Sequence, residues 1–481
     1  MKKLFCGTAV CLSMVLSACG GGGDGGSSAP PPVQIAPPAA PSPSPTAGCS
    51  LLSRQNWVNS QIRNDYLFLD TLPASLDPSG FSSVQAYIDG LTATARAQRK
   101  DRFFTYITSI AQENAFFASG SSAGFGVRLS TDVAARRLFI AEAFEGAPAL
   151  AAGLDRGTEI LAIGTSASDI RTVDAIIAAE GSAGITAALG PSTAGTTRLL
   201  RFRNASGTVE RSVTKADFSI TPVSSRYGAL VLNDGAKKVG YLNLRTFIDP
   251  ANPALRSAFS NFKSQGITEV IVDFRYNGGG LVSVAELMGD LLGGNRSTSE
   301  QFSRTVFNAN LASNNSTRNF RPQAESISSM KIAFIGTGGS ASASELVMNA
   351  FIPYLRGNTA LVGTNTFGKP VGQIARDRAE CDDRLRVVAF ATQNAAGQGD
   401  YYDGLASKFD ATCQASDDIT RQLGDPQEAS TKAALDFLAG RVCTRIGASS
   451  GIGTRSLREG GRELLTPDQP DVAQREVPGY F

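Results

Sequence analysis

Three alternating serines follow an apolar run and a glycine-rich turn, directly before a helical pattern. They occupy the segment Ser340-Ala341-Ser342-Ala343-Ser344-Glu345. Such a turn exposes a hydroxyl group at the end of a sheet. It also directs backbone N–H groups and the positive end of the helix dipole toward developing negative charge. Ser342 and Glu345 equally fit a capping box, so a well-capped helix start is the alternative interpretation.

A lysine lies 27 residues after Ser342, between apolar, glycine and proline neighbours. This is Lys369 in the segment Thr366-Phe367-Gly368-Lys369-Pro370-Val371-Gly372-Gln373, which has no adjacent acid. A lysine that acts as a base must be neutral, and burial lowers its pKa. Gln373 could orient the amine without adding charge. A solvated surface lysine is the alternative, because most lysines are exposed.

A third segment, Asp273-Phe274-Arg275-Tyr276-Asn277-Gly278-Gly279-Gly280, directly follows an apolar strand pattern. Three glycines allow the backbone to approach a substrate closely, and their N–H groups could stabilise an oxyanion. A phosphate-binding loop is the competing interpretation. No Gly-Lys-Ser/Thr follows, which disfavours a Walker-type nucleotide site.

The sequence contains no histidine. This excludes Ser–His–Asp and Cys–His catalysis and every histidine metal ligand. A hydrolase must therefore take its base from a lysine, a carboxylate, a tyrosine or an activated water. We expect no cofactor and no metal.

Together and in this order, the three segments resemble the core of the C-terminal processing (tail-specific) peptidases. The segment Asp101-Arg102-Phe103-Phe104-Thr105-Tyr106 adds to the resemblance, which covers roughly residues 50–440. The resemblance implies a serine peptidase with a Ser–Lys pair. The fold it implies is an α/β multidomain chain: an N-terminal helical domain, a PDZ-like β-rich module, and a peptidase core like those of crotonases and Clp proteases.

The resemblance also implies a role for each matching residue. Ser342 is the nucleophile, Lys369 is the general base and Gln373 supports the lysine. The oxyanion donors are the N–H of Ala343 and one N–H of the glycine run, for which we choose Gly279.

Two departures from the family pattern bear on these roles. The 27 residues between Ser342 and Lys369 are about two more than the family pattern suggests. Ser344 therefore remains the second choice of nucleophile. Pro370 stands where a glycine often follows the lysine.

Residues 119–222 combine short β-like runs with glycine-rich turns and one helical segment at Thr172–Ala179. The run Gly146–Ile160 and the segment Gly124-Phe125-Gly126-Val127 resemble a PDZ domain. That likeness implies that the loop Gly124–Val127 offers backbone N–H groups to the terminal carboxylate of a peptide. A glycine hairpin without a ligand is the alternative.

The remaining regions follow from periodicity. Residues 48–118 show helical spacing and predict a small helical domain. Residues 223–446 alternate strand and helix patterns, which predicts a sheet with crossover helices. Residues 447–481 are polar with scattered glycine and proline, so we expect a loose tail.

Residues 1–18 form a basic and apolar leader, and Leu16-Ser17-Ala18-Cys19 looks like a bacterial lipobox. Cys19 would then carry lipids, and the Gly- and Pro-rich residues 19–47 would be a linker. An ordinary cleavage site is the alternative. These features predict an exported lipoprotein of the cell envelope, in the outer membrane or on a periplasm-facing membrane.

Four further cysteines, an even number in an exported chain, predict two disulfides with three possible connectivities. We choose Cys381–Cys413 with Cys49–Cys443; buried free thiols are the alternative. Without Lys2 and Lys3 of the leader, 43 basic and 43 acidic residues remain, so no nucleic-acid partner is expected.

The expected function is an endopeptidase that cleaves exported polypeptides near their free C-termini, with tail capture by the PDZ-like module. A non-catalytic tail-binding lipoprotein on the same fold is the alternative. Acyl chemistry on a non-peptide substrate is a third possibility, since related α/β folds handle other acyl substrates.

Overall fold

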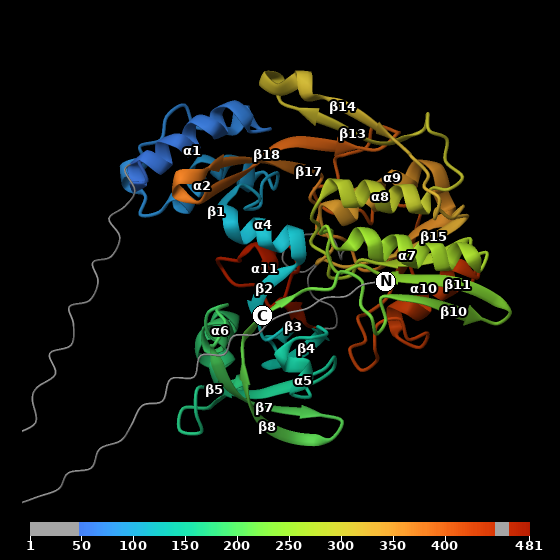
Figure 1. The fold of residues 1–481 in the computed structure, drawn as a ribbon, viewed down its shortest axis with the longest axis horizontal. Helices are drawn as coiled ribbons and strands as arrows, with labels where there is room; N and C mark the ends of the chain where they lie inside the picture. Colours follow the sequence, from blue (N-terminus) through green and yellow to red (C-terminus); the bar gives the residue numbers. More distant parts are fainter. Residues whose placement is uncertain (1–47, 448–460) are drawn as a thin grey trace, which may run out of the picture. The chain divides into compact units, whose positions relative to one another are not determined.

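Nearly continuous apolar runs form the central sheet of the chain, because parallel strands are buried on both faces. The computed structural model describes residues 48–447 and 461–481, and these described residues belong to one compact unit (Figure 1). The predicted leader, Cys19 and most of the linker lie outside the described residues. Within the described ranges, no helix has the length and apolar composition needed to span a membrane.

Six strands make the central sheet, in the order β10-β11-β12-β15-β16-β19, and only the β10–β11 pair is antiparallel. They are β10 (Ala229–Asp234), β11 (Lys237–Asn243), β12 (Glu269–Asp273), β15 (Lys331–Gly336), β16 (Thr359–Gly363) and β19 (Ala411–Gln414). The three chemical motifs follow β12, β15 and β16, which are neighbours. They therefore meet at the carboxyl edge of the sheet, where α/β folds commonly bind ligands.

Helices cover both faces of this sheet. On one face, every second strand residue points into an apolar core shared with three helices. These are α7 (Ala251–Ser264), α8 (Val282–Leu292) and α9 (Ala343–Leu355). The other face packs on α10 (Ala429–Leu438). The predicted alternation of strands and crossover helices is present in this sheet. The strands within residues 301–319 and 371–393 of the predicted core lie in a second sheet instead.

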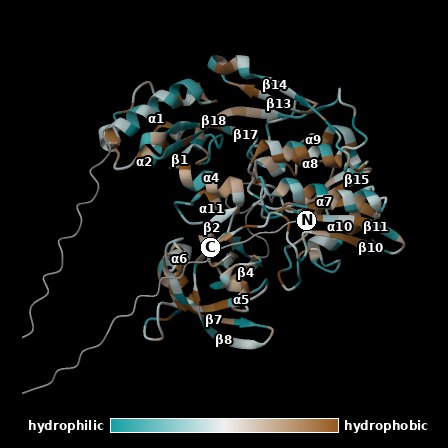
Figure 2. Cartoon of the chain, viewed as in Figure 1, coloured by the Kyte–Doolittle hydropathy of each residue, from teal (hydrophilic) through white to brown (hydrophobic). Residues whose placement is uncertain are grey.

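A second, antiparallel sheet joins distant parts of the chain, with β18 (Asp383–Gln393) at its centre. The strands around it are β1 (Tyr106–Ser109), β13 (Gln301–Phe307), β14 (Ser316–Asn319) and β17 (Val371–Arg378). The N-terminal helices α1 (Leu51–Asp65), α2 (Val84–Leu91) and α3 (Ala93–Ala97) share an apolar core with residues 371–388. In Figure 2, α1 is largely the teal of hydrophilic residues, as expected of a helix that buries one side.

Short helical turns complete these two regions. They are η1 (Leu69–Thr71), η2 (Pro78–Gly80), η3 (Ala309–Asn314), η4 (Arg356–Asn358) and η5 (Ala379–Cys381). None of these turns contains one of the three motifs, but η5 contains Cys381.

The region predicted to be PDZ-like is a sheet of order β20-β3-β4-β5-β7-β8 that packs on α6 (Val173–Leu189) and α5 (Pro148–Ala151). Its strands are β3 (Val127–Asp132), β4 (Arg137–Ala143), β5 (Glu159–Gly164), β6 (Arg171–Thr172), β7 (Thr197–Asn204), β8 (Gly207–Thr214) and β20 (Glu463–Leu464). α4 (Ile110–Ser119) and the pair β2 (Ser121–Gly124) and β9 (Ala216–Ser219) connect it to its neighbours.

The expectation of a loose tail is wrong for residues 461–481. This part contains β20 and α11 (Val472–Glu476), and Tyr480 and Phe481 are 0% and 2% exposed. We call residues 461–481 the C-terminal segment. Its composition is polar, but its apolar side chains, including Leu465, Val477 and Phe481, are buried against the rest of the molecule.

The chosen disulfide pairing is also wrong, because the bonds are Cys49–Cys381 and Cys413–Cys443. Cys49 precedes α1, and Arg378 beside η5 donates to the Gly48 carbonyl oxygen at 2.6 Å, which brings the first pair together. Cys413 on β19 meets Cys443 just after α10, where the Gln414 N–H donates to the Thr444 oxygen at 2.7 Å. Cys413 and Cys443 are 30 residues apart, about the same separation as in the chosen pair Cys381–Cys413, so the pairing is set by how the strands and helices pack.

Candidate active site

The serine turn places Ser342 at the first turn of α9 in a conformation that is unusual for a residue with a side chain. Its φ is 55° and its ψ is −114°. Backbone strain of this kind concentrates at functional sites, and a sharp strand-to-helix turn is how nucleophilic serines are commonly exposed. The β15 strand ends six residues earlier and α9 begins one residue later.

The two flanking serines are engaged in the interior. The Ser340 hydroxyl donates to the Phe274 oxygen at 2.7 Å, and the Ser344 hydroxyl donates to the Asn277 oxygen at 2.9 Å. Both residues are 0% exposed, whereas Ser342 is half-buried. The environment therefore favours Ser342 over Ser344 as an accessible hydroxyl group.

A buried carboxylate joins the serine turn to the lysine loop. Glu345 Oε2 accepts the backbone N–H of Ser342 at 3.1 Å and that of Lys369 at 2.7 Å. The two backbone nitrogens are thus no farther apart than the sum of these distances. Glu345 Oε1 accepts from the Thr366 hydroxyl at 2.6 Å and the Gly368 N–H at 2.7 Å. Burial raises the pKa of the Glu345 carboxyl, and these four donors oppose the shift.

Lys369 projects its amine toward a polar partner and an aromatic ring. The Nζ donates to Gln373 Oε1 at 2.9 Å and lies 5.0 Å from the centre of the Phe104 ring. Gln373 Nε2 in turn donates to the Phe104 oxygen at 2.5 Å, which fixes the amide orientation. Burial lowers the pKa of the Lys369 ammonium, against a rise due to Glu476. The amine is thus moved toward the neutral form that a base requires.

The segment before β1 holds the lysine loop in place. Arg102 Nη2 donates to the Phe367 oxygen at 2.7 Å and to the Gly368 oxygen at 2.6 Å, and its guanidinium lies 4.0 Å from the Phe367 ring centre. The sequence showed this segment only as part of a family resemblance. Its positioning role required knowing that β1 pairs with β18 beside β17.

Gly279, the predicted oxyanion donor, lies against the serine turn. A Cβ on Gly279 would come within 2.8 Å of Ser342 Cβ and 3.3 Å of the Ala343 nitrogen, and its φ of 125° also requires glycine. The two predicted donor residues, Gly279 and Ala343, are therefore adjacent. In this structure the Gly279 N–H donates to Asn277 Oδ1 at 2.9 Å.

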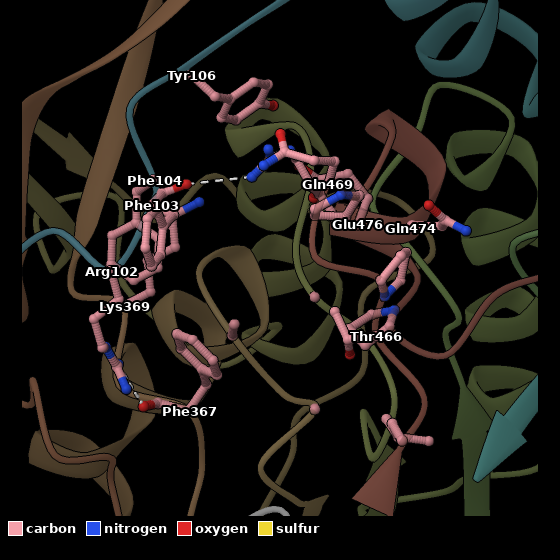
Figure 3. A pocket seen from close by; sticks show the side chains of 18 of the residues that line it. Arg102, Phe103, Phe104, Tyr106, Phe367, Lys369, Thr466, Gln469, Gln474 and Glu476 are labelled. Atoms are coloured by element: carbon pink, nitrogen blue, oxygen red, sulfur yellow. Dashed lines mark hydrogen bonds between the residues drawn. The ribbon is translucent and has the colours of Figure 1, made fainter. Parts of the chain in front are cut away.

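A cavity of about 520 Å³ opens beside these loops (Figure 3). Lys369, Gly278 and Ala341, the residue before Ser342, contribute to its wall. In Figure 3, Lys369 and Phe104 face Glu476 and Gln474 of the C-terminal segment across the opening. No sequence signal identified this second wall.

The predicted carboxylate loop Gly124–Val127 is apart from the catalytic motifs in sequence and leads into β3. The N–H groups of Gly126 and Val127 converge on one oxygen, that of Phe481, at 3.0 and 3.2 Å. Phe125 is buried in the apolar core of the region predicted to be PDZ-like. The four predicted binding residues therefore lie at the start of β3, on an edge that is already paired with the C-terminal segment.

Buried charges connect this region to the peptidase-like core. Arg156 Nη2 contacts Asp417 Oδ1 at 2.5 Å, and Arg156 Nη1 donates to the Tyr276 hydroxyl at 2.9 Å. Arg275 also contacts Asp417, at 3.0 Å. Burial alone would raise the pKa of Asp417, but these two guanidinium groups hold it below its usual range. Tyr276, which follows Arg275 in the core, therefore also contacts Arg156 of the region predicted to be PDZ-like.

Residues 238–399 match the model of peptidase family S41. Over 280 residues the chain is 27% identical to the C-terminal processing peptidase, chloroplastic, of Tetradesmus obliquus, covering 54% of each protein. Over 335 residues it is 24% identical to the carboxyl-terminal-processing protease of a Synechocystis species, covering 69% of this chain and 72% of the relative. The chain spans about half the length of the first of these relatives.

Among solved structures, the fold matches a Bacteroides fragilis NCTC 9343 protein assigned to the S41 proteases. The TM-score is 0.61 and the identity is 24%, over 80% of this chain and 97% of the other. A likeness of this extent supports the α/β multidomain architecture with its N-terminal helices.

Proposed function

We propose that this chain, which carries a domain of peptidase family S41, is a serine endopeptidase that cleaves exported polypeptides near their C-termini. Ser342 is the nucleophile and Lys369 is the general base. The observation that carries this proposal is the Glu345 carboxylate, which holds the backbone N–H groups of both residues on one oxygen atom.

In the proposed mechanism, neutral Lys369 Nζ takes the proton of the Ser342 hydroxyl while Oγ attacks the peptide carbonyl carbon. The oxyanion receives the N–H groups of Ala343 and Gly279. Lys369 then gives its proton to the leaving amine as the C–N bond breaks. Water, deprotonated by Lys369, hydrolyses the acyl-enzyme and regenerates the serine.

The oxyanion loop must change before this step, because the Gly279 N–H donates to Asn277 Oδ1 in the structure. Turning that single N–H toward substrate breaks one internal hydrogen bond. Substrate binding that replaces it therefore completes the site, in the manner of an induced fit.

For substrate capture, we propose that the loop Gly124–Val127 binds the terminal carboxylate of the polypeptide and that β3 pairs with its last residues. The domain limits used here, 48–118, 119–222 and 223–446, remain predictions. So do lipid attachment at Cys19 and residence in the cell envelope, which would supply exported substrates. The chemistry requires no cofactor.

The test is cleavage of an unfolded reporter with an apolar C-terminal tail by a chain that begins at residue 48. Lys369→Ala is expected to reduce cleavage by at least about 10²–10⁴-fold, the usual contribution of a general base. Ser342→Ala is expected to reduce it by about 10⁶-fold, as the loss of a serine nucleophile does. Ser344→Ala is the matched control, since its hydroxyl serves only the Asn277 oxygen. Loss with Ser344→Ala alone would move the nucleophile by two residues.

Cleavage that survives all three substitutions would refute the Ser–Lys mechanism. If the parent chain binds tail peptides but does not cleave, the tail-binding lipoprotein becomes the better description. Circular dichroism of each variant separates a lost activity from a lost fold.

A further inference from the structure

The C-terminal segment occupies the free edge of β3 in two pieces. The first is β20, where Leu464 pairs with Ser130 and the Leu465 N–H donates to the Leu129 oxygen at 3.0 Å. The second is residues 479–481, where the Leu129 N–H donates to the Gly479 oxygen at 2.7 Å. The other edge of β3 is paired with β4. An extended segment added to a sheet edge is a common mode of peptide recognition.

Phe481 pairs with the loop Gly124–Val127 through its backbone, as a residue of a bound peptide strand would. The Phe481 N–H donates to the Val127 oxygen at 2.9 Å, and the Phe481 oxygen accepts the N–H groups of Gly126 and Val127. Two backbone N–H groups that converge on one oxygen are the donor set that the loop Gly124–Val127 would offer to the carboxylate of a peptide.

Both aromatic side chains at this end are buried in separate sites. Phe481 belongs to the apolar core that contains Phe125 and Val127. The Tyr480 ring lies 6.0 and 6.2 Å from the ring centres of Phe144 and Phe218. Successive residues of a strand point to opposite faces, so Tyr480 and Phe481 are buried in two different apolar clusters.

Between its two strand pieces, the segment crosses the cavity beside Lys369 (Figure 3). The Gly278 N–H of the proposed oxyanion loop donates to the Glu476 oxygen at 3.0 Å. The Arg475 guanidinium lies 3.9 Å from the Tyr106 ring centre, and its Nη1 donates to the Phe103 oxygen at 3.2 Å. One stretch of chain therefore fills both the tail groove and a wall of the catalytic cavity.

We propose that the C-terminal segment is a resident ligand of this groove, and that the groove selects free C-termini ending in two aromatic residues, which must displace it. The proposal rests on the proposed function in naming polypeptide tails as substrates and the loop Gly124–Val127 as the site of their carboxylate. A ligand tethered in the same chain acts at an effective concentration on the order of millimolar. An incoming tail must compete with that concentration before it reaches the Ser342 turn.

The binding test uses a Ser342→Ala chain with a specific protease site placed within residues 448–460. The probe is a fluorescent peptide that copies residues 470–481 with a free carboxylate. Cutting the site converts the tethered ligand into a dissociable one, so the peptide should bind at least about tenfold more tightly after cutting. The same peptide as an amide, or with serine at its last two positions, should lose at least about tenfold in affinity.

A second variant guards against unfolding of the cut protein. Phe481→Ser weakens the resident ligand in an uncut chain, and the peptide should again bind at least about tenfold more tightly. Asp468→Asn is the matched control, because this exposed residue lies in the same segment away from the β3 edge. It should leave peptide affinity unchanged.

Equal affinity for the acid and the amide, or for aromatic and serine endings, would overturn the proposal. So would peptide affinity that neither cutting nor Phe481→Ser changes while the fold is retained. These measurements are independent of catalysis. A parent chain that cleaves without this preference refutes only the present inference, whereas binding without cleavage refutes only the peptidase.

Discussion

The loops that carry Ser342 and Lys369 differ from the β3 groove in how they are held. Each of these two loops is fixed from inside the molecule, through a backbone hydrogen bond to the buried Glu345. The groove is instead completed from outside, by residues more than 330 positions away in the chain. Interior anchoring gives fixed geometry, whereas an edge filled by a separate segment can exchange its occupant.

The largest expected effect is at the interior anchor. Glu345→Ala leaves four buried donors without their carboxylate, including the Ser342 and Lys369 N–H groups. We expect cleavage to fall by about 10²–10⁴-fold, because the base and the nucleophile lose their common support. Steady-state kinetics on the reporter measures the loss.

Glu345→Gln sharpens the same test, because it keeps the shape and one acceptor oxygen. It should retain more activity than Glu345→Ala. The exposed Glu380→Gln is the control and should behave as the parent chain. Parent-like activity in Glu345→Ala would mean that the loops hold their positions without this carboxylate.

The second effect concerns the junction between the two regions. Arg156→Met removes a buried guanidinium that contacts Asp417 and donates to the Tyr276 hydroxyl. Removing one partner of a buried ion pair typically costs about 3–5 kcal/mol, so the free energy of unfolding should fall by that amount. Urea denaturation gives the value.

The surface pair Arg201–Glu210 provides the contrast. Arg201→Met removes a half-exposed ion pair on the β7–β8 hairpin and should cost less than about 1 kcal/mol. Equal losses in the two variants would show that the Arg156 cluster does not stabilise the junction.

The same contrast explains what could be predicted from the sequence. The motifs after β12, β15 and β16 were found because each is contiguous and follows an apolar strand pattern, and parallel strands bring their ends together. Helix α9 (Ala343–Leu355) begins directly after Ser342, as the helical pattern that follows the serine segment predicts. Local pattern and topology were sufficient there.

Features that depend on distant packing could not be predicted. Glu345 had the signature of a capping residue, and only the fold shows that it also binds the lysine loop. The disulfide partners of Cys49 and Cys413 depend on how α1 and α10 dock. The C-terminal segment is polar in composition, yet its two terminal aromatic residues find their sites only in the assembled molecule.

The smallest expected effect tests whether the segment also influences the base. The charged groups that affect the Lys369 amine are Glu476 and Arg475 of the segment, with Asp101 and Arg386 from other elements. The negative charge of Glu476 raises the pKa of Lys369, against the lowering by burial. Because only neutral Lys369 is a base, Glu476→Gln should move the rising limb of the pH–rate profile to lower pH.

The measurement is cleavage rate against pH in parent and Glu476→Gln chains, with Asp468→Asn as the control. Burial raises the pKa of the Glu476 carboxyl itself, and Lys369 opposes that rise, so the two groups stabilise each other's charge. Displacement of the whole segment would remove Glu476 and Arg475 together, whose effects on the pKa of Lys369 oppose each other, so the single substitution isolates the carboxylate. If the rising limb of the pH–rate profile lies at the same pH in the parent and Glu476→Gln chains, Glu476 does not affect the base. The segment would then act only by occupying the groove.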